Sequence, residues 1–122
     1  MATKDVAQGL VDLCKQGQFM EAVIAYYSDN IVSVEPMGDP AEVRGIDAVK
    51  GKAEWFASNM EVHEMKLEGP YINGDTFAVR FTLDATMKPT GKRSTMDEIA
   101  VYTVADDKIV HEQFLYGGAP TS

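Results

Sequence analysis

Three side chains in this sequence have the chemistry and the setting to move a proton. Glu35 ends the apolar run 31–34 and stands directly before a proline, while Glu112 alternates with apolar residues near the end of the chain. His63 lies in another alternating run. A carboxylate in a half-dry apolar cleft has a raised pKa, so it can exchange a proton near neutral pH. Glu35, Glu112 and His63 are therefore the predicted catalytic residues.

Aromatic residues accompany these acids and could hold a substrate. If 106–108 form a three-residue hairpin loop, period-2 alternation puts Tyr102 opposite Glu112 and Ala100 opposite Phe114. Tyrosine hydroxyls at such positions can donate to an enolate or alkoxide oxygen. The predicted substrate-binding residues are Trp55, Phe81, Glu98, Tyr102, Phe114 and Tyr116.

Each of these assignments has a simpler structural alternative. Acidic residues are mostly exposed, so Glu35 also fits a solvated turn. Glu98 and Glu112 fit solvent-facing positions or ion pairs with an arginine, either Arg80 or Arg93. His63 fits a buried structural histidine, and the aromatic residues fit an ordinary core.

The composition sets the class of protein before any site is considered. The chain has 122 residues, which fits a single domain over 1–122, and 45% hydrophobic residues can form a core. A net charge of −8 with scattered basic residues argues against nucleic acid. The chain has one cysteine and no histidine cluster, so we expect no metal and no cofactor. It has no long apolar stretch, so we expect no membrane contact and a cytoplasmic location.

The sequence predicts helices first and antiparallel strands afterwards. Apolar residues recur at helical spacing in the first part of the chain, and Asn73-Gly74 is a strong hairpin signal. This order is typical of an α+β domain in which helices cover one face of a curved sheet. We expect helices near 3–17, 18–27 and 46–59, and strands near 31–35, 61–68, 76–87, 93–104 and 109–116, with 28–30 ending the second helix and 69–70 ending a strand.

Three stretches of the chain resemble a known superfamily: YYSDNIVSVEP, VRGIDAVKGKAEWF and YTVADDKIVHEQFLYG. Together they resemble the SnoaL-like branch of the nuclear transport factor 2-like superfamily. The resemblance implies three helices on a strongly curved, mainly antiparallel sheet that forms a cone with an internal pocket. It also implies a homodimer. Because this fold carries isomerases, cyclases, dehydratases and non-catalytic domains, it does not give the function.

The resemblance extends to some catalytic positions and not to others. VEPMG is similar to the motif that carries the general base of ketosteroid isomerases, and it places Glu35 at that position. The two oxyanion donors of those enzymes correspond to Leu10 and Ala100, neither of which can donate. Loss of each donor costs on the order of 3 kcal/mol of transition-state stabilisation, so the resemblance does not favour a steroid isomerase.

Two functions remain open at this point. The first is an isomerase, cyclase or dehydratase that acts by general acid/base proton transfer on a small hydrophobic carbonyl-type molecule. The second is a non-catalytic ligand-binding or dimerisation domain.

Overall fold

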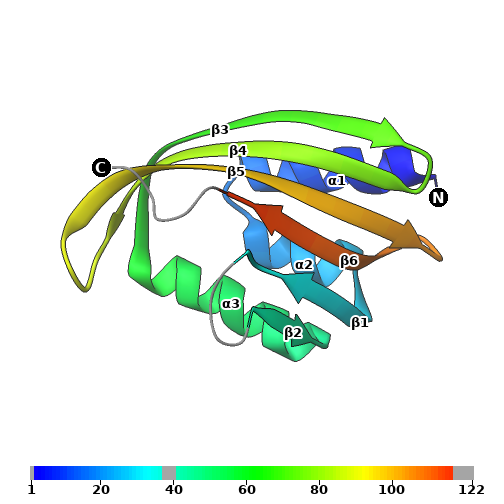
Figure 1. Ribbon diagram of the computed structural model, residues 1–122, viewed down its shortest axis with the longest axis horizontal. Helices are drawn as coiled ribbons and strands as arrows, with labels where there is room; N and C mark the ends of the chain where they lie inside the picture. Colours follow the sequence, from blue (N-terminus) through cyan, green and yellow to red (C-terminus); the bar gives the residue numbers. More distant parts are fainter. Residues whose placement is uncertain (1, 37–40, 117–122) are drawn as a thin grey trace.

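A computed structural model of the chain describes residues 2–36 and 41–116. Within these ranges the chain forms three helices and one six-stranded sheet (Figure 1). The elements follow one another as α1 (Thr3–Lys15), α2 (Phe19–Tyr26), β1 (Tyr27–Val34), β2 (Glu42–Arg44), α3 (Ile46–Asn59), β3 (Met60–Asn73), β4 (Thr76–Met87), β5 (Lys92–Ala105) and β6 (Lys108–Leu115).

The strand order in the sheet is β2-β1-β6-β5-β4-β3, and neighbouring strands are antiparallel except for the parallel pair β1 and β6. The long strands β3, β4 and β5 arch over the molecule, and the three helices lie on one side of the sheet (Figure 1). Register shifts interrupt the pairing of β1 with β6, β3 with β4 and β5 with β6. Such irregularities bend and twist strands, which suits a sheet that curls around its own concave face. The predicted α+β fold with a curved sheet is confirmed.

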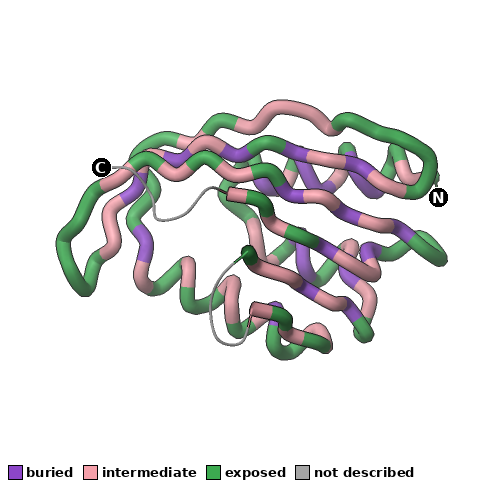
Figure 2. Tube along the Cα trace, viewed as in Figure 1, coloured by how far each residue is buried: buried purple, intermediate pink, exposed green. Residues whose placement is uncertain are grey.

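The core lies between the concave face of the sheet and the helices. Buried and less buried residues alternate along β4 and β5, as period-2 geometry requires (Figure 2). Helix α1 packs against β3 and β4 and contributes the buried residues Val6, Leu10 and Val11. Transferring this apolar area from water supplies the main driving force for placing the helix on the sheet.

The hairpin between β5 and β6 sets the register of the concave face. The predicted three-residue loop is wrong: Asp106 and Asp107 form a two-residue turn with φ of 51° and 64°. Asp is one of the few non-glycine residues that adopt this left-handed conformation readily. A register shift between Thr103 and Val104 then restores the predicted pairing of Tyr102 with Glu112.

Three boundaries differ from the sequence-based expectation. The second helix passes directly into β1 at Tyr27, so residues 28–30 are strand and not a turn. β3 continues through Gly69-Pro70 with a register shift, and Gly69 has a φ of 117° that favours glycine. The short strand β2 was not predicted, because three residues are too few to show a period.

Candidate functional site

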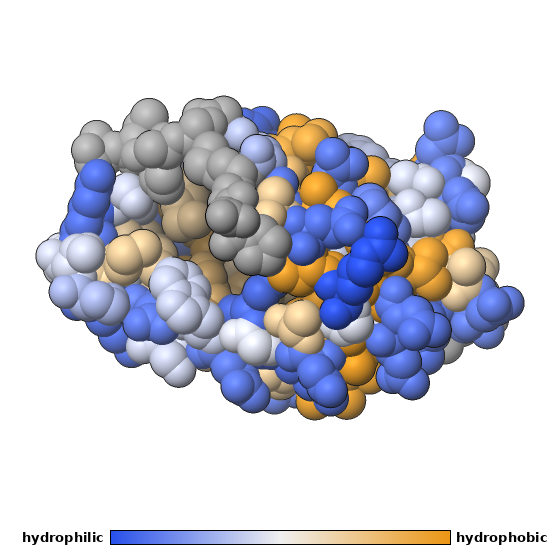
Figure 3. Space-filling view, turned by 60° about the horizontal axis from the view of Figure 1, so that its bottom comes forward, coloured by the Kyte–Doolittle hydropathy of each residue, from blue (hydrophilic) through white to orange (hydrophobic). Residues whose placement is uncertain are grey.

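A cavity of about 870 Å³ lies between the concave face of the sheet and the three helices. This volume falls in the range of about 300–1,000 Å³ that is typical of small-molecule sites. Its wall includes Trp55, which is 53% exposed, so the cavity is open to solvent on that side. The space-filling view shows a hollow of weakly apolar surface on one face of the molecule (Figure 3).

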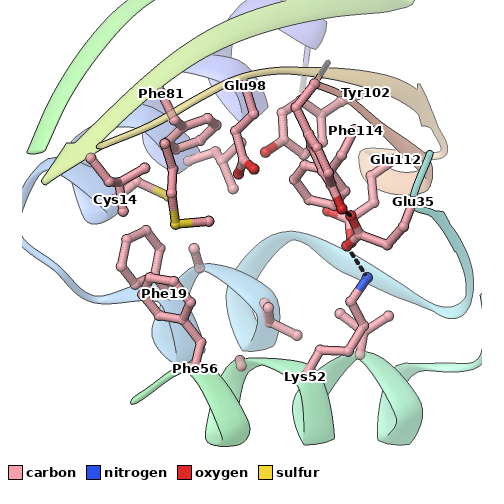
Figure 4. Close-up of a pocket in the computed structure, with 18 of the residues that line it drawn as sticks. Cys14, Phe19, Glu35, Lys52, Phe56, Phe81, Glu98, Tyr102, Glu112 and Phe114 are labelled. Atoms are coloured by element: carbon pink, nitrogen blue, oxygen red, sulfur yellow. Dashed lines mark hydrogen bonds and ion pairs between the residues drawn. The ribbon is translucent and has the colours of Figure 1, made fainter. Parts of the chain in front are cut away.

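One end of the cavity is apolar. Phe19 of α2 and Phe56 of α3 pack edge to face with ring centroids 5.7 Å apart. Cys14 of α1 and Phe81 of β4 lie near them on the wall (Figure 4). Burial, with the nearby Glu112 charge adding to it, raises the pKa of the Cys14 thiol to about 12. The thiol is therefore protonated at neutral pH and is part of the apolar surface.

The other end of the cavity is built around the buried carboxylate of Glu112, which is 2% exposed. Tyr27 donates a hydrogen bond to Glu112 Oε1, and Ser33 Oγ donates to Oε2 over 2.7 Å. The parallel pairing of β1 with β6 places Ser33 beside Glu112. Burial raises the pKa of Glu112 above its ordinary value, and the two hydrogen bonds offset only part of this rise. Both carboxylate oxygens are thus already engaged within the protein.

An ion pair continues this polar end toward the cavity. Lys52 Nζ of α3 lies 2.8 Å from Glu35 Oε1 and donates to Ser33 Oγ over 2.9 Å (Figure 4). Tyr116 Oη donates to the other Glu35 oxygen, Oε2, over 3.1 Å. Burial and the Glu35 carboxylate raise the pKa of Tyr116 to about 12, so its hydroxyl remains a donor. Glu35, like Glu112, has both oxygens engaged.

Glu98 is the one glutamate of the cavity wall that the described part of the chain leaves without a hydrogen bond or an ion pair. It projects from β5, where it pairs with Phe81 of β4, into the space between sheet and helices (Figure 4). Burial raises its pKa to about 7, with further contributions from Glu35 and Glu112 against an opposing one from Lys52. A carboxyl group with this pKa is present in both protonation states at neutral pH.

The structure brings together eight of the nine predicted site residues as parts of one cavity wall. His63 is the exception: it is exposed on β3, and its Nε2 lies 2.7 Å from Thr86 Oγ1. The roles of all nine remain predictions. The alternative in which an arginine pairs with Glu98 or Glu112 is wrong, since Arg80 pairs with Asp97 and Arg93 with Asp84. The eight residues in the wall are Glu35, Trp55, Phe81, Glu98, Tyr102, Glu112, Phe114 and Tyr116.

Sequence reasoning missed three residues of the polar end: Tyr27, Ser33 and Lys52. For Lys52 a signal exists, because it lies three positions after Val49 and four before Phe56 on the face of α3 that lines the cavity. For Ser33 and Tyr27 the signal is absent, because their proximity to Glu112 depends on a parallel pairing between strands about 80 residues apart.

Two further classes of site are not found in the described ranges. Within 2–36 and 41–116, no group of three or more His, Cys, Asp or Glu side chains is placed to hold a metal ion. None of the helices in the same ranges is both long enough and apolar enough to cross a membrane.

The curled sheet, the three covering helices and the cavity between them define a nuclear transport factor 2-like cone fold. The sequence model of the SnoaL-like domain matches residues 1–116, and the chain belongs to this family. A comparison with curated proteins finds no match.

Solved structures agree with this assignment. A Mesorhizobium loti protein, provisionally named a SnoaL-like polyketide cyclase [carbohydrate phosphatase], is 44% identical with a TM-score of 0.90, and the alignment covers 95% of this chain and 100% of that one. A provisionally named isomerase from Bacillus subtilis has 15% identity, a TM-score of 0.76 and coverage of 93% and 88%. An NTF2-like protein from Anabaena variabilis has 18% identity, a TM-score of 0.75 and coverage of 96% and 90%. The last two show similarity of fold alone.

Proposed function

We propose that this protein is an enzyme that transfers a proton on a small hydrophobic carbonyl-type substrate, as an isomerase, cyclase or dehydratase does. The observation that carries the proposal is the Glu98 carboxyl group, which faces the cavity without a hydrogen-bond or ion-pair partner in the described residues. Glu98 is half-buried, and partial burial without a partner disfavours its charged form. A carboxyl group with a perturbed pKa that faces a cavity is a candidate for exchanging a proton with a ligand.

The base in this proposal is Glu98 and not the two sequence-based candidates. Glu112 already accepts two hydrogen bonds, and Glu35 is held by Lys52 and Tyr116. Ionised Glu98 removes a proton from the carbon next to the carbonyl, and the electron pair of the C–H bond moves into the enolate. Glu98 then returns that proton to another carbon or to a departing hydroxyl. In a cyclisation the enolate carbon instead attacks a second carbonyl, and Glu98 gives its proton to the alkoxide that forms. Protons and charge balance in each case.

The comparisons support the class of reaction and not a particular substrate. The Mesorhizobium loti relative, at 44% identity, carries the provisional name of a SnoaL-like polyketide cyclase. The apolar end of the cavity, with Phe19, Phe56 and Phe81, fits the hydrophobic body of such a substrate.

Exchange of carbon-bound hydrogen for deuterium tests this proposal without knowledge of the natural substrate. A panel of enolisable aryl and alicyclic ketones is incubated with the protein in D₂O, and loss of the α-proton signal is followed by NMR. We expect Glu98→Gln to slow exchange by about 10²-fold or more, because general-base catalysis contributes about 10²–10⁴-fold. Glu54→Gln, which changes an exposed carboxylate of α3, is the matched control. Equal exchange rates for folded wild type and Glu98→Gln would refute the proposal.

The second candidate function is non-catalytic binding of a hydrophobic ligand. It is favoured by the apolar residues Leu10 and Ala100 at the positions where the resemblance to ketosteroid isomerases implies oxyanion donors. Ketones that bind the cavity without any α-proton exchange would support this function.

We also propose that the protein forms a homodimer through the convex face of the sheet. Ile99 and Leu115 are paired neighbours on β5 and β6 and are 41% and 45% exposed, so they provide apolar area for a partner. Light scattering that gives the mass of a monomer at micromolar concentration would overturn this proposal.

A further inference from the structure

The ammonium group of Lys52 lies at the boundary between the polar end of the cavity and its open space. Its Nζ has three N–H bonds, and the described residues provide two acceptors, Glu35 Oε1 at 2.8 Å and Ser33 Oγ at 2.9 Å. Nζ also lies 5.3 Å from the centroid of the Phe114 ring, which is itself part of the cavity wall. Among the residues that the structure describes, one N–H of this charged group is therefore left without an acceptor, and Nζ lies beside an aromatic surface.

We propose that Lys52 binds the carbonyl oxygen of the substrate and stabilises the negative charge that develops on it. The cavity would then select molecules with a neutral hydrophobic body and an oxygen acceptor at one end. This inference rests on the proposed function, to which it adds an electrophilic residue and a substrate class.

The surroundings of Lys52 hold its ammonium group in one place. Ser33 Oγ donates its own proton to Glu112, so its lone pair is directed to accept from Lys52. Tyr27 fixes the other oxygen of Glu112, and Tyr116 fixes the far oxygen of Glu35. Donors that are fixed before the reaction stabilise a developing oxyanion without the cost of reorganisation. Tyr27, Ser33 and Glu112 are thus positioning residues for Lys52.

The charges of the cavity explain why the site favours a neutral substrate. Three glutamate carboxyl groups, those of Glu35, Glu98 and Glu112, share the cavity with Lys52. A substrate carboxylate would meet this excess of negative charge. Formation of an enolate does not change the net charge of the cavity. Glu98 becomes neutral when it takes the proton, and the negative charge moves to an oxygen beside Lys52.

Binding of 2-naphthol and naphthalene tests the inference apart from turnover. The two probes share an aromatic body, and only 2-naphthol has an oxygen, whose ionisation is visible in its fluorescence. We expect Lys52→Met to weaken binding of 2-naphthol by about ten-fold or more, as loss of a charge-assisted hydrogen bond does. We expect its naphthalene affinity to change by less than about two-fold, because apolar contact depends on area and not on charge. Lys52→Arg keeps the cation and should keep most of the 2-naphthol affinity.

A series of more acidic naphthols sharpens the result. Wild-type affinity should rise as the naphthol becomes more acidic, because its proton passes to Glu98 and the cavity gains no net negative charge. Lys52→Met should flatten this dependence. Parallel losses for both probes in Lys52→Met, or no dependence on naphthol acidity in wild type, would overturn the inference. The two proposals fail separately. Equal ketone exchange rates for wild type and Glu98→Gln would refute the proposed reaction. A 2-naphthol affinity that does not change in Lys52→Met would refute only the role of Lys52 in binding the substrate oxygen.

Discussion

Replacing Glu98 by glutamine should stabilise the folded protein relative to wild type, and this difference should grow as the pH rises. Burial raises the pKa of this carboxyl group from 4.5 to about 7. A raised pKa means that the folded protein holds the proton more tightly than the unfolded chain does. Stability from this group is therefore complete below about pH 4.5 and is lost as the pH rises to about 7. A glutamine side chain cannot ionise, so Glu98→Gln should remove the loss.

The size of the effect follows from the same pKa. One pKa unit corresponds to about 1.4 kcal/mol, so the rise of about 2.5 units (7 − 4.5) sets a ceiling of about 3.5 kcal/mol. The chain has an isoelectric point near 4.6, so measurements are better begun at about pH 5.5. The remaining 1.5 units give about 2 kcal/mol, and partial exposure of Glu98 to solvent reduces this to about 1 kcal/mol.

Urea unfolding of wild type and Glu98→Gln at about pH 5.5 and pH 8.5 measures this difference directly. We expect the free energy of unfolding of the variant, relative to wild type, to increase by about 1 kcal/mol between the two pH values. Glu54→Gln should show no such increase, because Glu54 is exposed on α3. If the free energy of unfolding of Glu98→Gln relative to wild type stays constant or decreases with pH, the argument that the cavity desolvates this carboxyl group is refuted.

Three other measurements examine separate parts of the site. If Glu98 is the base, ketone exchange should increase as the pH rises through about 7 and then level off, since the base must be ionised; a rate that falls over this range would contradict the assignment. Tyr27→Phe removes a donor from the buried Glu112 carboxylate and should lower the free energy of unfolding by about 1–3 kcal/mol, and an unchanged urea midpoint would show that the hydrogen bond is dispensable. Cys14, with a pKa of about 12, should react with a maleimide far more slowly at pH 8 in folded protein than in urea, and equal rates would place the thiol in solvent.

Alternation along the strands predicted much of the cavity wall. The predicted pairings of Tyr102 with Glu112 and of Ala100 with Phe114 are confirmed. Both were reached with the wrong turn: a two-residue turn alone would shift β6 by one residue and reverse its faces. The register shift next to Val104 compensates. Bulges of this kind have no clear sequence signature, so agreement at such a position does not show that the local geometry was understood.

The polar end of the cavity could not be predicted in the same way. It joins Ser33 of β1, Lys52 of α3 and Glu112 of β6, and the contacts depend on the parallel pairing of β1 with β6. No local pattern encodes which strands become neighbours. Without that pairing Glu35 and Glu112 are two similar acidic residues, and their shared neighbour Lys52 is one of the two lysines of α3.

The distribution of hydrogen bonds explains why the chemistry is assigned to Glu98 and Lys52 and not to the more deeply buried Glu112. A reacting group must exchange its bonds with a substrate, and Glu112 could do so only by losing Tyr27 or Ser33, at about 1–3 kcal/mol for each abandoned buried partner. Within residues 2–36 and 41–116, Glu98 has no hydrogen-bond or ion-pair partner to lose, and Lys52 has an N–H that neither Glu35 nor Ser33 uses. The groups with unused bonding capacity therefore lie where a ligand can reach them, and the saturated cluster behind them supplies rigidity and charge.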